Sequence, residues 1–116
     1  MKKITAGFIL IFSLASCINQ KAKFTVTNKT TLLLDSLLID PNSSEKEKYI
    51  SLKPGQTQQY VCDISHQSSD GAYFISFKQG LAKRFLPFGY FSNGNVMEKY
   101  IEVEIYTDTI MIRPVY

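Results

Sequence analysis

Apolar and polar residues alternate with a period of two along most of the chain after residue 22. Phe24 and Val26 alternate with threonines in the first such series. Tyr73, Ile75 and Phe77 are the apolar members of a later series. Successive side chains of a β-strand point to opposite faces of its sheet, so this alternation predicts strands with one buried face. Strands of this kind are expected at residues 24–27, 49–52, 58–64, 73–77, 84–91, 101–105 and 110–112.

One apolar run departs from this alternation. Residues 32–39 are apolar except for Asp35 and Ser36. A strand buried on both faces has such a run, and a short helix gives the same pattern, so periodicity leaves both structures open. The hairpin at residues 101–112 is less ambiguous, because Glu102 and Glu104 alternate with β-branched residues ahead of a turn at residues 107–108.

Turn-forming residues separate the expected strands. In Lys53-Pro54-Gly55-Gln56 the proline fixes the first central φ and the glycine supplies a positive second one, which predicts a type II turn. Asn93-Gly94 is typical of a tight turn, and residues 40–44 are rich in turn formers. Short strands at this spacing predict an all-β fold, an antiparallel β-sandwich of about seven strands.

The apolar stretch at the start of the chain has a different character. Residues 4–15 are mostly apolar and uncharged, and they follow Lys2 and Lys3. A basic start, a short apolar segment and small residues at its end predict a secretory signal peptide. An uncleaved membrane anchor is the alternative, but a spanning helix needs about 20 apolar residues.

The end of this stretch, Leu14-Ala15-Ser16-Cys17, resembles the lipobox of bacterial lipoproteins. The resemblance implies removal of residues 1–16 and acylation of Cys17, which places the protein in the cell envelope. Residues 17–22 are then the acylated cysteine and a tether, and residues 23–116 the sandwich domain. Ile18 stands where an aspartate would signal inner-membrane retention, so the resemblance favours the outer membrane, facing the periplasm. An ordinary signal peptide that happens to contain Cys17 is the alternative.

Composition limits the classes of partner that the mature chain can bind. The whole chain carries a net charge of +3, but loss of Lys2 and Lys3 leaves it almost neutral. Nucleic-acid binding needs a strong basic footprint, so that class is excluded. With Cys17 acylated, Cys62 is the remaining cysteine, and it shares a parity with Tyr60 and Ile64. We expect Cys62 to be buried and inert, since an unpaired cysteine behaves as a small hydrophobic residue.

Catalytic residues are sparse. Asp63, the single histidine His66, and Asp70 could together bind a metal or position a base, but the same residues read more simply as a polar loop after a strand. Glu102 and Glu104 fall on the solvent side of their predicted strand. We therefore expect no catalytic residue, metal site or cofactor, and a protein that is not an enzyme.

Residues 71–97 combine many aromatic side chains with basic ones and contain no acidic residue. Exposed aromatic residues beside arginine and lysine are typical of protein interfaces. The alternative is that these rings form the core of a small domain. The candidate partner surface comprises Phe74, Lys83, Arg84, Phe85, Phe88, Tyr90 and Phe91.

The strand–turn–strand segment at residues 50–57 is similar to segments of the small immunoglobulin-like or transthyretin-like domains of bacterial envelope proteins. Residues 70–73 and 88–94 resemble those of small Bacteroidota-type envelope lipoproteins. Together these observations predict a lipid-anchored, non-enzymatic protein-binding module, an accessory subunit of an envelope complex. The alternative is a periplasmic inhibitor or immunity protein that blocks a toxin or hydrolase.

Overall fold

The computed structural model describes residues 20–43, 48–92 and 94–116. Residues 1–19, including Cys17, lie outside this part, as do residues 44–47 and Asn93. Within the described ranges no helix is long and apolar enough to cross a membrane. The strands in these ranges are β1 (Lys21–Asn28), β2 (Leu34–Asp40), β3 (Ile50–Leu52), β4 (Thr57–Asp63), β5 (Gly71–Gln79), β6 (Ala82–Phe91), β7 (Tyr100–Ile105) and β8 (Ile110–Val115).

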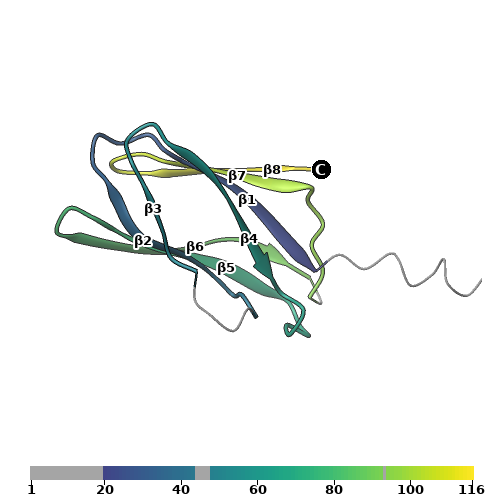
Figure 1. Ribbon diagram of the computed structural model, residues 1–116. Helices are drawn as coiled ribbons and strands as arrows, with labels where there is room; N and C mark the ends of the chain where they lie inside the picture. Colours follow the sequence, from purple (N-terminus) through teal and green to yellow (C-terminus); the bar gives the residue numbers. More distant parts are fainter. Residues whose placement is uncertain (1–19, 44–47, 93) are drawn as a thin grey trace, which may run out of the picture.

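The strands form two four-stranded sheets that pack face to face, so the predicted all-β sandwich is confirmed at this level (Figure 1). The first sheet has the order β4-β1-β7-β8, and the second has the order β3-β2-β5-β6. Each sheet therefore combines strands from both halves of the chain. The expectation of a wholly antiparallel fold is wrong for one pair, because β1 and β7 run parallel.

The core lies between the sheets and is built from the alternating apolar positions. Tyr73, Ile75 and Phe77 are buried on β5, as predicted. The inward-facing apolar side chains of β1, β4 and β7 are buried opposite them. Leu86 of β6 and Ile110 and Ile112 of β8 are partly buried against the core. The buried apolar positions of the first sheet are Ala22, Phe24, Val26, Tyr60, Cys62, Ile101, Val103 and Ile105.

The run without alternation is the strand β2, so the helical alternative is wrong. Its pairing with β5 shifts register between Asp35 and Leu38, and Ser36 has a φ of 53°. This bulge places an extra residue in the strand, and alternation resumes out of phase after it. Leu34 and Leu37, three positions apart, therefore both face the core.

The start of β1 and one turn can also be compared with the sequence predictions. β1 begins at Lys21, three residues before the strand predicted at 24–27, because Lys21 already pairs with Asp63 of β4. The turn at residues 53–56 is confirmed, since Gly55 has a φ of 82° and the Gln56 N–H donates to the Lys53 carbonyl at 3.0 Å.

Candidate interaction surface

Two exposed phenylalanines stack on the outer side of the second sheet. The rings of Phe74 on β5 and Phe85 on β6 lie 5.5 Å apart, with an angle of 15° between their planes. Phe74 is 38% exposed and Phe85 is 65% exposed. Pro87, also exposed, pairs directly with Phe74. We refer to Phe74, Phe85 and Pro87 as the aromatic face.

Strand geometry accounts for the direction of these side chains. Tyr73 and Ile75 point into the core, so Phe74 between them points outward. Phe85 pairs with Ser76, which has the same parity as Phe74. Phe74 and Phe85 are therefore diagonal neighbours across the two strands, a separation that aromatic side chains can bridge.

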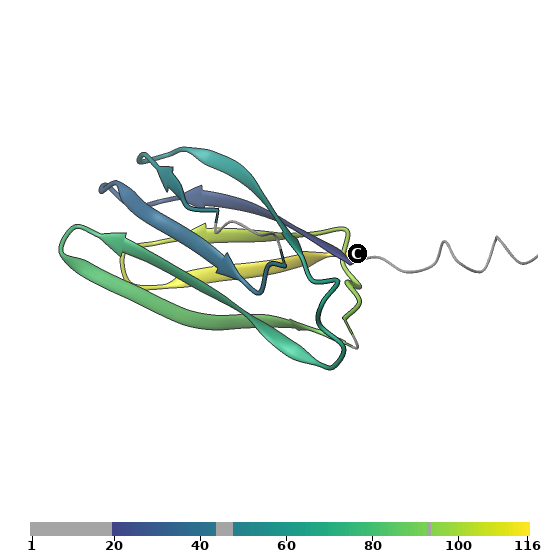
Figure 2. The same cartoon turned by 60° about the horizontal axis from the view of Figure 1, so that its bottom comes forward.

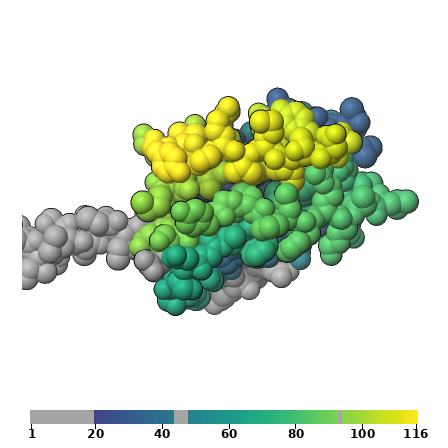
Figure 3. All heavy atoms as spheres, turned by 180° about the vertical axis from the view of Figure 1, so that it is seen from behind, coloured from purple at the N-terminus to yellow at the C-terminus, as the bar shows by residue number. Residues whose placement is uncertain are grey.

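The aromatic face lies at an open edge, because β6 is the last strand of the second sheet. Figure 3 shows β5 and β6 in green, below β8 in yellow. Proline has no backbone N–H, so Pro87 fits an edge strand when its nitrogen faces away from the paired neighbour. A proline on an exposed edge also opposes pairing with a further strand. Pro87 thus leaves one position of this edge without a backbone donor.

Two lysines extend the aromatic face toward the β5–β6 turn. Lys78 and Lys83 are directly opposite each other and both are exposed. Like charges in that position repel each other. Asp35 of β2 lies opposite Lys78 on its other side, so Lys83 is the outermost charge of this row. A cavity of about 240 Å³ beside them is lined by Ser36, Tyr49, Ser76, Phe77, Lys78 and Lys83.

Arg84 does not belong to the predicted surface. It pairs with Phe77, an inward-facing residue, and its guanidinium carbon lies 5.2 Å from the centre of that ring. Its Nη1 atom donates to the backbone carbonyls of Tyr106, at 2.9 Å, and Thr107, at 3.3 Å. Arg84 therefore closes one end of the core by joining β6 to the β7–β8 turn.

Phe88 and Phe91 are also removed from the predicted surface, because both are buried. Tyr73 pairs with Phe88 and Gly71 with Phe91, so β6 contains one residue more than β5 over this stretch. Gly89, with a φ of 54°, lies in this bulge. The additional residue lets two positions of opposite parity face inward, which strict alternation could not predict.

Tyr90 is exposed but lies beyond the bulge, near the end of β6, apart from the aromatic face. It lines a hollow with Ser92, Met97, Glu98 and Tyr116. The predicted surface thus separates into an aromatic face, a buried part and Tyr90. The candidate partner surface predicted from the sequence omitted Lys78 and Pro87. Lys78 could have been included, because it has the same parity as Phe74 on the same strand.

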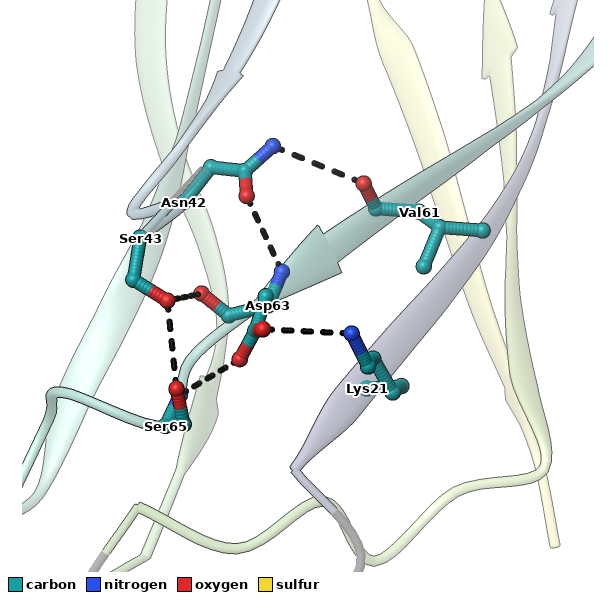
Figure 4. A network of polar contacts seen from close by, with 6 residues as sticks. All are labelled: Lys21, Asn42, Ser43, Val61, Asp63 and Ser65. Carbon is teal, nitrogen blue, oxygen red and sulfur yellow. Dashed lines mark hydrogen bonds and ion pairs between the residues drawn. The ribbon is translucent and has the colours of Figure 1, made fainter. Parts of the chain in front are cut away.

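The predicted polar loop begins at Asp63, the last residue of β4. The Asp63 carboxylate accepts the Ser65 N–H at 2.9 Å and forms an ion pair with Lys21 at 3.1 Å (Figure 4). These interactions hold the pKa of Asp63 well below its usual range, and the hydrogen bond from the Ser65 N–H contributes most. His66 is exposed in the turn that follows. In the described residues no three His, Cys, Asp or Glu side chains gather where they could hold a metal ion.

The outer side of the first sheet carries an open groove of about 470 Å³. It is lined by Lys23, Phe24, Thr25, Gln59, Val61, Lys99 and Tyr100. Nearby, Glu102 forms an ion pair with Arg113, and Glu104 accepts a hydrogen bond from the Tyr106 hydroxyl at 3.1 Å. Glu102 therefore joins β7 to β8 on the solvent side, whereas Glu104 contacts the residue that follows its own strand.

Fold and surface together define a small β-sandwich domain with an exposed aromatic face at one sheet edge. No protein-family model matches the chain, and no curated protein matches its sequence.

Proposed function

We propose that this chain is a lipid-anchored, non-enzymatic protein-binding module of the bacterial cell envelope, held at the outer membrane and facing the periplasm. The observation that carries the proposal is the stacked, exposed pair of Phe74 and Phe85. Aromatic residues are enriched at the centres of protein interfaces, where excluding water from large rings contributes most of the binding energy.

The anchor in this proposal is Cys17, at the end of a segment that resembles a signal peptide with a lipobox. Two or three acyl chains bind a protein stably to a bilayer, because each buried methylene contributes about 0.8 kcal/mol. A protein fixed in this way meets partners of the same envelope, so the partner is expected to be an envelope protein.

Within this proposal the domain is a transthyretin-like rather than an immunoglobulin-like sandwich, and strand order supports the choice. In the immunoglobulin constant type the first two strands lie in one sheet. Here β1 and β2 lie in different sheets, and β1 pairs with β4 and β7. The domain also lacks tryptophan, which packs on the disulfide of antibody domains.

The partner is expected to pack against side chains rather than to add a strand. Pro87 interrupts the backbone donors of β6, so an incoming strand would lose a hydrogen bond there. Lys78 and Lys83 repel each other and would be stabilised by carboxylates from a partner. The complementary surface therefore has an apolar patch for the two rings and acidic residues toward the β5–β6 turn.

A site-specific crosslinking experiment tests this proposal. A photoreactive phenylalanine analogue replaces Phe85 in the full-length protein, and in a control it replaces the exposed Met111 on β8. We expect a discrete crosslinked protein at position 85 and none at 111. Phe74→Ser with Phe85→Ser should lower co-purification of that protein about tenfold, as for loss of an interface anchor, while Met111→Ser leaves it unchanged.

The outcomes separate the parts of the proposal. Equal crosslinking at both positions would refute the aromatic face as a binding surface. A crosslinked toxin or hydrolase that loses its activity would make the chain an inhibitor instead. In parallel, Cys17→Ser should move the protein from the membrane to a soluble or unprocessed pool, and unchanged membrane fractionation without attached lipid would refute the anchor.

A further inference from the structure

Three exposed side chains gather at the end of the sandwich where β1 begins. Tyr90 is 67% exposed, Met97 is 70% exposed and Tyr116 is 72% exposed. They line one hollow of about 260 Å³ with Ser92 and Glu98. We refer to Tyr90, Met97 and Tyr116 as the basal rim.

Strand pairing places the basal rim at the same end of the sandwich as the start of β1. β1 and β7 are parallel, so both begin at this end. The Lys99 N–H donates to the Val115 carbonyl at 2.7 Å, which holds Tyr116 next to the residues before β7. Figures 1 and 2 both show the C-terminal residue at the same end of the sandwich as the start of β1. The β5–β6 turn, with the exposed Leu81, lies at the opposite end.

The length of chain before β1 limits how far this end can lie from a lipid on Cys17. Three residues, 18–20, separate Cys17 from Lys21. An extended chain advances at most about 3.6 Å per residue, so the two Cα atoms are within about 14 Å of each other. A bilayer has roughly 5–7 Å of polar headgroup region on each side of its hydrocarbon core. With Cys17 acylated, the end of the sandwich that carries the basal rim is therefore held near the headgroups.

We propose that the basal rim docks onto the surface of the bilayer that holds the acylated Cys17, an inference that rests on the lipid anchor of the proposed function. Tyrosine suits this position because its ring is apolar and its hydroxyl remains hydrated among the headgroups. Met97 adds a flexible apolar side chain. Glu98 also lines the hollow, so its carboxylate places a negative group there for a lipid ammonium.

Docking would orient the whole domain. With the basal rim on the membrane, the sandwich stands on this end, and the β5–β6 turn points away from the bilayer. The aromatic face on the side of the second sheet then remains open to the periplasm. The rim and the aromatic face are thus separate surfaces with different partners.

Fluorescence quenching provides the test, because the chain contains no tryptophan. Full-length lipidated protein carrying Met97→Trp is reconstituted into vesicles of phosphatidylethanolamine and phosphatidylglycerol that contain brominated acyl chains. Leu81→Trp at the opposite end is the matched control. An interfacial side chain enters the boundary between headgroups and acyl chains, so we expect about twofold quenching at position 97 and almost none at position 81.

Flotation of the same vesicles distinguishes the two proposals. Protein that floats with the vesicles but shows no quenching at position 97 would refute docking of the rim while leaving the anchor intact. Protein that fails to float would refute the anchor itself, and with it the basis for docking. Tyr116→Trp is a second reporter of the rim, to be read in the same way if Met97→Trp does not fold.

Discussion

At the residue scale, Cys62 is a buried thiol that bridges the two sheets. Its side chain lies in the core, and its Sγ atom donates to the Ile39 carbonyl across the two sheets at 3.4 Å. Burial, with a smaller contribution from the charge of Asp40, raises the pKa of the Cys62 thiol to about 12. The sequence prediction of a buried cysteine is confirmed, and its physical basis is the shared parity with Tyr60.

We expect the Cys62 thiol to resist modification in the folded protein. In Cys17→Ser, where Cys62 is the remaining cysteine, a thiol reagent at pH 8 should react only as the protein unfolds. A pKa near 12 leaves roughly one thiol in 10⁴ ionised at that pH, because each unit is a factor of ten. Absorbance of the released reagent measures the rate, with protein in denaturant as the control. Rapid reaction without denaturant would contradict the burial.

At the element scale, Asn28 joins the end of β1 to two other segments. Its Nδ2 atom donates to the carbonyls of Leu32, at 2.8 Å, and Leu52, at 2.9 Å. Its Oδ1 atom accepts the backbone N–H of Thr30 at 2.9 Å and the Thr30 hydroxyl at 2.7 Å. The residue is fully buried, so these bonds replace those it would make with water. Asn28 thereby connects the first sheet to β3 of the second.

Asn28→Ala should lower the free energy of unfolding by about 2–4 kcal/mol, because it leaves buried backbone groups without partners. Chemical denaturation measures the change. The exposed neighbour Lys29 offers the matched control, and Lys29→Ala should stay within about 0.5 kcal/mol of the unmodified protein. A similar small change for both variants would show that Asn28 is not needed to hold this junction.

At the scale of the whole molecule, a polar network around Asp63 joins the two sheets at the end where β1 begins. The Ser43 hydroxyl donates to the Asp63 carbonyl at 2.7 Å, and the Asn42 side chain accepts the Asp63 N–H at 3.1 Å. Ser43 and Asn42 follow β2 of the second sheet, whereas Asp63 ends β4 of the first (Figure 4). The carboxylate also pairs with Lys21 of β1.

This network predicts a specific dependence on pH. Because the pKa of Asp63 is lowered on folding, its ionised form stabilises the folded state. The contribution is complete well above the ordinary carboxyl pKa of about 4 and is lost as the pH falls below it. Asp63→Asn should therefore be less stable than the unmodified protein at pH 7, with a difference that narrows below about pH 4. Thermal unfolding across this range measures the difference, and a constant gap would contradict the prediction.

The sequence predicted the parts of the surface that depend on alternation alone. Phe74 lies outside between the buried Tyr73 and Ile75. Phe85 lies outside between Arg84, which packs on the Phe77 ring, and the partly buried Leu86. Phe88 and Phe91 were assigned to the same surface, but Phe88 shares the inward parity of Leu86, and the bulge at Gly89 turns Phe91 inward as well. A glycine within a strand pattern can signal such a bulge, yet it does not specify which neighbouring side chains change face.

Gly94 likewise has one property that the sequence predicts and another that only the tertiary structure shows. The dipeptide with Asn93 predicts a turn glycine, and Gly94 has a φ of 70°. The structure adds a second constraint, since a Cβ atom there would lie 2.0 Å from the Gln67 carbonyl oxygen. Local chemistry predicts the first property, but only the packing of a distant loop produces the second.

By itself, the sequence determined the strands, most of the buried faces and the β7–β8 hairpin, because these follow from a repeat of two residues and from short-range turn chemistry. Only the tertiary structure decided that β1 and β7 are parallel neighbours, that Arg84 turns to the carbonyls of the β7–β8 turn, and that the basal rim assembles from β6, the segment before β7 and Tyr116. These features join residues far apart in the chain, and no local pattern records which of them will meet.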